Sequence, residues 1–164
     1  MTIVSRPPTI LLFGYGNPGR GDDGVGPALI EAMQQHLSDH NRMAEIECLT
    51  DMQLQIEHIV DMVGRERILF IDADMSCEKA CSLRPLLPEK DDSYTSHAMS
   101  PDALVYTYQQ IYGTPAPASY VLSIRTYHFE LGDDLCDDAR QNLYLAIEMA
   151  KVFCESAHTT TTTD

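Results

Sequence analysis

The chain has 164 residues, a formal net charge of −14 and a hydrophobic content of 44%. This length and this apolar content predict a globular protein with a sizeable core. The negative charge disfavours nucleic acid and anionic membranes as partners, because their phosphate groups would repel the protein. A cationic partner, such as a basic peptide or a metal ion, remains compatible with it.

The sequence shows no sign of a membrane span or a secretory leader. No apolar run approaches the roughly 20 residues that cross a bilayer. The N-terminal stretch MTIVSRPPTI lacks the apolar core of a signal peptide. We therefore expect a cytoplasmic protein.

The cysteine content favours reduced thiols over a disulfide framework or a structural zinc site. The count of five is odd, and no CxxC pair occurs. We expect mostly buried, reduced side chains at Cys48, Cys77, Cys81, Cys136 and Cys154.

Apolar patterns in the first half of the chain predict strands that alternate with helices. Residues 9–13 (TILLF) form a short apolar run, which is typical of a buried parallel strand. From Val25 onward the apolar residues recur at helical spacing, so an amphipathic helix is expected there. The next predicted elements are a strand over residues 45–50, a helix over residues 54–63 and a buried strand over residues 68–71.

The second half continues the alternation. Residues 80–87 predict an edge strand, because Pro85 cannot donate to a neighbouring strand. Ser100 is a good helix cap, and the helix is expected to reach about Tyr112. The last predicted elements are a strand over residues 120–124, a helix over residues 137–155 and a disordered tail over residues 159–164.

This order of elements predicts an α/β fold. Alternating strands and helices favour a mostly parallel, twisted sheet between two helix layers, here with about five strands. We therefore expect a single three-layer α/β/α domain over residues 1–158, followed by the tail.

The glycine-rich stretch GYGNPGRGDDGVG follows the first strand. Gly14, Gly16 and Gly19 satisfy the GxGxxG pattern, but the dinucleotide fingerprint also needs a helix N-terminus that can receive phosphate. Asp22 and Asp23 place negative charge at that position instead. The loop is therefore predicted to present carboxylate to a cation.

The two acids have a structural alternative. Either could simply cap the helix that follows. We favour the capping role for Asp22. For Asp23 two roles remain open: it could cap the helix, or its side chain could point into the cleft.

Three side chains are expected to meet at the carboxyl edge of the sheet, where open α/β sheets bind ligands. Asp23 follows the first strand, Asp72 ends the third, and His97 lies in a polar loop before the Ser100 helix. Two carboxylates and an imidazole suit a divalent transition metal or acid–base chemistry. Asp74 could take the place of Asp72.

These segments resemble a known family. GYGNPGRGDDGVG is similar to the signature GxGNxLxxD(D/E)GxG of the [NiFe]-hydrogenase maturation proteases, the HybD/HycI-like endopeptidases. The resemblance continues through LTDMQLQIEHIVDMVGRERILFIDAD and SYTSHAMSPDALVYTYQQIYG, and it covers Ile10 to about Val152. The middle segments are most similar to the branch that serves NAD-reducing bidirectional hydrogenases. Gly19 stands where the family has Leu, which implies a more flexible loop, and Asn17 is expected to orient the loop backbone.

The resemblance implies an activity. The family removes a C-terminal extension from the hydrogenase large-subunit precursor after nickel has been inserted. Its members engage that nickel through an acid in the glycine loop, an Asp after the third strand and a loop His, which correspond to Asp23, Asp72 and His97. The implied partner is the precursor, the nickel is carried by the substrate, and we expect no tightly bound metal in the enzyme, which we expect to be a monomer.

The sequence lacks the motifs of other proteases. GxSxG, HExxH and a recognisable Cys–His pair are absent. Water could be activated by Asp72, as in an aspartic mechanism, or as metal-bound hydroxide. Two alternatives remain: a chaperone that checks for nickel without cutting, and a dinucleotide-binding protein that uses the glycines together with Asp51.

Overall fold

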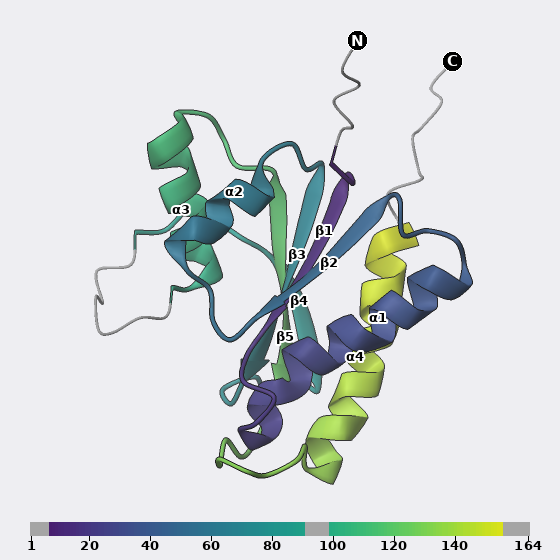
Figure 1. Ribbon diagram of the computed structural model, residues 1–164. Coiled ribbons are helices and arrows are strands. Elements are labelled where there is room, and N and C mark those ends of the chain that lie inside the picture. Colours follow the sequence, from purple (N-terminus) through teal and green to yellow (C-terminus); the bar gives the residue numbers. More distant parts are fainter. Residues whose placement is uncertain (1–6, 91–98, 156–164) are drawn as a thin grey trace.

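The computed structural model describes residues 7–90 and 99–155 (Figure 1). Two short 3-10 turns, η1 (Gly21–Gly24) and η2 (Ile56–His58), precede the first two helices. The strands and helices in chain order are β1 (Ile10–Tyr15), α1 (Val25–Asp39), β2 (Ile46–Asp51), α2 (Ile59–Met62), β3 (Arg67–Asp74), β4 (Cys81–Pro85), α3 (Pro101–Tyr112), β5 (Ala118–Arg125) and α4 (Asp137–Glu155).

The strands form one five-stranded sheet in the order β2-β1-β3-β5-β4. The first four strands in this order run parallel, and β4 pairs antiparallel with β5 at the edge. Pro85 therefore lies on an edge strand, as its missing N–H group predicts. The predicted α/β fold is confirmed.

Helices cover both faces of the sheet. Figure 1 shows α1 and α4 on one face and α2 and α3 on the other. Successive β1 side chains enter different cores: Leu12 packs in the cluster beneath α1 and α4, and Phe13 packs in the cluster beneath α2 and α3. This two-sided burial explains why the strand reads as a continuous apolar run.

Both long helices of the second half begin and end where the sequence predicts. Ser100 caps α3, since its Oγ accepts the Ala103 N–H at 3.1 Å. Gly113 ends α3 in the left-handed conformation with φ of 71°. No helix in the described part of the chain combines the length and the apolar character needed to cross a membrane.

The helix predicted over residues 54–63 is wrong in extent. Gln55 is extended, with φ of −133° and ψ of 159°, so helical structure begins only after it. Val63 is extended again, with ψ of 131°. The apolar side chains of Ile56, Val60 and Val63 are exposed, so part of the apolar pattern does not mark a buried face. The tail predicted over residues 159–164 lies outside the described residues.

Candidate functional site

The site is built at the carboxyl edge of the sheet, where β1 and β3 end side by side. Gly14 of β1 pairs with Ile71 of β3, so Tyr15 and Asp72 follow on adjacent strands. The Tyr15 hydroxyl donates a hydrogen bond to the Asp72 carboxylate. Burial, followed by the charge of Asp72, raises the pKa of Tyr15 well above its ordinary value, so the phenol stays protonated and remains a donor.

Asp72 has a strongly perturbed carboxyl group. Its pKa is raised from the ordinary value of 3.8 to about 7, mainly by burial and also by the negative charges of Asp74 and Asp23. The hydrogen bond from Tyr15 acts in the opposite direction. Clustered carboxyl groups with such shifts are typical of functional sites.

Asp74, the alternative to Asp72, is engaged in the turn after β3. Its Oδ1 accepts the Ser76 N–H at 2.8 Å and the Ser76 hydroxyl at 2.6 Å. This is the turn-stabilising role common for Asp. Asp72 therefore remains the better candidate for the site.

The glycine loop brings its backbone against the Asp23 backbone. Gly16 has φ of 138°, and a Cβ atom there would lie 2.0 Å from the Asp23 carbonyl oxygen. The Asn17 N–H donates to Asp23 Oδ2 at 2.7 Å, and Asn17 Oδ1 accepts the Gly19 N–H at 2.8 Å. Asn17 thus orients the loop, and within the described residues Asp23 Oδ1 takes no hydrogen bond, which leaves it available to a ligand.

Asp22 has a different role from the helix cap that we expected. The residue before α1 is Gly24, with no side-chain cap, and both acids lie in η1. Asp22 is fully buried, and its carboxylate accepts backbone N–H groups from a distant loop: Tyr127 at 2.8 Å, His128 at 3.0 Å and Cys136 at 2.8 Å. Burial disfavours its ionisation, but these hydrogen bonds outweigh that effect and lower its pKa.

Backbone hydrogen bonds extend this link between the glycine loop and the loop from β5 to α4. The Gly21 N–H donates to the Asp133 carbonyl at 2.9 Å, the Asp22 N–H to the His128 carbonyl at 2.8 Å, and the Gly132 N–H to the Gly19 carbonyl at 2.8 Å. Figure 1 shows these two connections together beneath the sheet, where α1 and α4 begin. These hydrogen bonds therefore hold the glycine loop, which carries Asp23, against the loop from β5 to α4.

The sequence did not single out the neighbours contributed by β4 and α3. Arg84 of β4 donates two hydrogen bonds to the Asp102 carboxylate, at 3.1 and 2.9 Å. The charges of both residues act on Tyr15, so the first turn of α3 lies near the Tyr15–Asp72 pair. For Tyr15, the sequence offered one signal. Side chains alternate between the two faces of a strand, so Tyr15 is expected on the same face of β1 as Phe13.

Asp51, the acid required by the dinucleotide alternative, already has partners. Its Oδ1 accepts the Met52 N–H at 2.6 Å, and its Oδ2 lies 3.0 Å from His58 Nε2. His58 Nδ1 accepts the Gln55 N–H at 2.9 Å, so the ring proton is on Nε2 and points to Asp51. These contacts, with two acids ahead of α1, argue against a dinucleotide site.

Only two of the three residues predicted to bind the metal lie in the described part of the chain. Asp23 and Asp72 interact electrostatically, while His97 lies outside the described residues. Within residues 7–90 and 99–155, no group of three or more His, Cys, Asp or Glu side chains is arranged to hold a metal ion. The five cysteines are free thiols; Cys154 is buried and the others are half-buried.

None of the protein-family models and none of the curated protein sequences matches this chain. Solved structures match it in fold. HycI, a [NiFe] hydrogenase maturation protease from Thermococcus kodakarensis KOD1, aligns with a TM-score of 0.67 and 15% identity, over 88% of this chain and 92% of that chain. The hydrogenase maturating endopeptidase HybD from E. coli aligns with a TM-score of 0.68 and 18% identity, over 91% and 93% of the two chains.

An uncharacterized protein from Wolinella succinogenes aligns with a TM-score of 0.60 and 22% identity, over 91% of this chain and 98% of that chain. These alignments span almost the whole of each chain. The link to the branch serving bidirectional hydrogenases stays a prediction. This chain has the fold of the [NiFe]-hydrogenase maturation proteases.

Proposed function

We propose that this protein is an endopeptidase that removes the C-terminal extension of a nickel-loaded [NiFe]-hydrogenase large-subunit precursor. Asp23, Asp72 and His97 contact the nickel of the substrate, which is cargo of the precursor and not a resident cofactor of the enzyme. The fold supports this proposal, because it is shared by HycI, a [NiFe] hydrogenase maturation protease, and by HybD, a hydrogenase maturating endopeptidase.

The observation that carries the proposal is the electrostatic coupling of two carboxyl groups from different elements. The negative charge of Asp23, from the glycine loop, raises the pKa of Asp72, at the end of β3. Two carboxylates that interact in this way repel each other, and a divalent cation placed between them would relieve that repulsion. Carboxylate oxygens with an imidazole form a ligand set that first-row transition metals accept.

The position of α3 supports the inclusion of His97. Asp102, in the first turn of α3, acts electrostatically on Tyr15. His97 precedes Asp102 by five residues, a length of chain that spans at most roughly 18 Å. A chain of this length is compatible with the role proposed for His97.

Contact with the nickel would position the scissile peptide at the site. Holding the peptide bond beside the catalytic groups replaces a bimolecular encounter with an intramolecular one. Water, activated by Asp72 or at the nickel itself, then adds to the carbonyl carbon, and its proton passes to the amide nitrogen as the C–N bond breaks, which releases the amine of the C-terminal peptide. A precursor without nickel lacks the anchor and should escape cleavage.

The proposal is tested by incubating the protein with nickel-loaded and with nickel-free large-subunit precursor, followed by intact-mass spectrometry and gel filtration. We expect loss of a C-terminal peptide from the nickel-loaded precursor only. A stable complex with no change in mass would instead identify the chaperone alternative. Equal cleavage of both precursors would refute recognition through nickel.

A further inference from the structure

We propose that His36 and His40, at the C-terminal end of α1, form a binding site for a divalent transition metal ion that prefers imidazole, such as Zn²⁺, Ni²⁺ or Cu²⁺. This site is separate from the one proposed above and does not depend on it. The glycine loop leads into the N-terminus of α1, and the helix of 15 residues carries the chain roughly 20 Å away from it.

The two rings are already close together. His36 and His40 are four residues apart, which places them on one face of a helix. Their ring centroids are 4.3 Å apart and their planes are inclined by 41°. Two nitrogen ligands on one ion lie about 3 Å apart, since metal–nitrogen distances are about 2.1 Å. Small rotations of the two side chains would bring one nitrogen of each ring to that separation.

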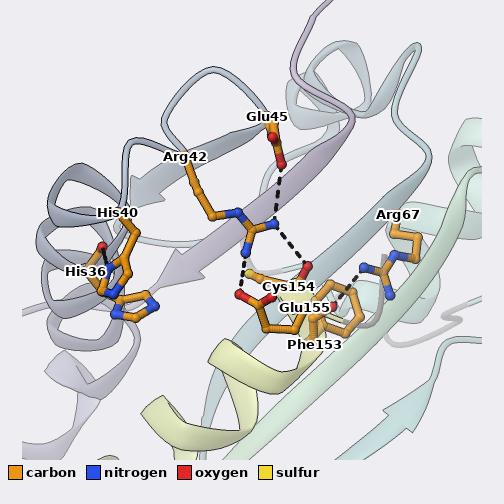
Figure 2. A network of polar contacts seen from close by, with 8 residues as sticks. All are labelled: His36, His40, Arg42, Glu45, Arg67, Phe153, Cys154 and Glu155. Atoms are coloured by element: carbon orange, nitrogen blue, oxygen red, sulfur yellow. Dashed lines mark hydrogen bonds and ion pairs between the residues drawn. The ribbon is translucent and has the colours of Figure 1, made fainter. Parts of the chain in front are cut away.

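A hydrogen bond prepares the His40 ring for coordination. His40 Nδ1 lies 2.7 Å from the His36 carbonyl oxygen (Figure 2). A carbonyl can only accept, so the proton of the neutral ring is on Nδ1 and the lone pair is on Nε2. Metal-binding histidines commonly donate their second ring nitrogen to a backbone carbonyl in this way.

The pair is accessible from solvent. His40 is exposed and His36 half-buried, so an ion can enter from solvent.

The neighbouring charged groups on α4 and after α1 have partners of their own. Glu155 accepts a hydrogen bond from Arg42, which also contacts Glu45 and the Cys154 carbonyl (Figure 2). Glu148 pairs with Lys151. The described residues therefore supply two protein ligands, and water would complete the coordination of the ion. The net charge of −14 favours cations near the surface.

A purely structural role makes a different prediction. The His40 hydrogen bond also satisfies a carbonyl group at the end of α1, as C-terminal capping side chains do. The His36 side chain takes no part in that capping bond, because only its backbone carbonyl accepts it. The variant His36→Gln therefore removes a metal ligand and leaves the cap intact.

The test is a titration of the full-length, metal-free chain with ZnCl₂, monitored through the NMR signals of its histidine rings. We expect the signals of His36 and His40 to shift together. His36→Gln and His40→Gln should each weaken this binding by about tenfold or more. The double variant should be little worse than either single variant, because two ligands that chelate one ion are not additive.

His128→Gln is the matched control, since His128 is an exposed histidine far along the chain, and it should leave the titration unchanged. Absence of any Zn²⁺-dependent shift at His36 and His40 would overturn the proposal. A shift of the His40 signals at the same ZnCl₂ concentration in His36→Gln as in the parent would also overturn it, since His40 would then bind the ion without His36.

Discussion

Asp22 and Cys136 are joined by two hydrogen bonds although 114 residues separate them: the Cys136 N–H donates to Asp22 Oδ1 at 2.8 Å, and its thiol donates to Oδ2 at 3.2 Å. This contact fixes the loop before α4 against the loop that carries Asp23. The first acid of the pair therefore fixes the loop, and the second, Asp23, is the one that we propose to act at the site.

The variant Asp22→Asn should lower the free energy of unfolding by about 2–4 kcal/mol, because its amide would face a buried N–H donor. Asp23→Asn is the matched control. Its Oδ1 can still accept the Asn17 N–H, so we expect a loss of less than about 1 kcal/mol. Urea unfolding followed by circular dichroism measures both. Equal losses in the two variants would contradict the division of roles.

The close approach of Gly16 to Asp23 makes a second prediction. Alanine at Gly16 would place a Cβ atom 2.0 Å from the Asp23 carbonyl oxygen, in a backbone with φ of 138°. We expect destabilisation of at least about 2 kcal/mol. Gly132→Ala is the control, since φ is 89° there and nothing lies within 4 Å of the added atom; its cost should be about 1 kcal/mol. Similar thermal melting of the two variants would contradict the steric explanation.

Asp72 should make stability depend on pH in an unusual direction. Its pKa is about 7 in the folded state, against an ordinary value of 3.8 that holds when the chain is unfolded. Between these values the unfolded state loses a proton that the folded state retains, so ionisation favours unfolding as pH rises. The penalty is absent below about pH 4 and complete above pH 7.

The variant Asp72→Asn removes this penalty. After allowance for solvent screening at a partly exposed group, we expect it to be more stable than the parent by on the order of 1–2 kcal/mol at pH 8 and equal at pH 4. Denaturant unfolding at the two pH values measures the difference. A variant that is less stable at pH 8 would show that Asp72 is ionised favourably in the folded protein.

The hydrogen bond from Tyr15 should hold the Asp72 pKa lower than burial alone would. It acts against the effects of burial and of the neighbouring acids. Tyr15→Phe should therefore raise the pKa of Asp72 above its present value of about 7. Carboxyl-carbon NMR titration of the parent and the variant follows the group directly. An unchanged or lower pKa would mean that the phenol does not donate to this carboxylate.

Local patterns in the sequence predicted most of the fold, because the spacing of apolar residues in most segments matches the helix or strand that the segment forms. The apolar run of β1 and the cap of α3 need only nearby residues. The helix over residues 54–63 failed for a long-range reason: Leu54 is buried in the sheet core and its carbonyl accepts the Met99 N–H, which holds this part of the segment out of the helix.

The candidate site was predictable only in part. Asp23 and Asp72 follow from the rule that ligands lie at the carboxyl ends of parallel strands. The role of Asp22 could not be predicted, because its partners Tyr127, His128 and Cys136 lie on a loop more than a hundred residues away. Arg84 and Asp102 likewise meet only once β4 and α3 are packed.

The most direct test of the proposed site is intact-mass spectrometry of a nickel-loaded large-subunit precursor incubated with single-site variants. Asp23→Asn, Asp72→Asn and His97→Ala should each fail to release the C-terminal peptide. Asp134→Asn, an exposed acid in the loop before α4, should release it as the parent does. Full cleavage by Asp23→Asn or Asp72→Asn would contradict a site in which these two carboxylates engage the nickel.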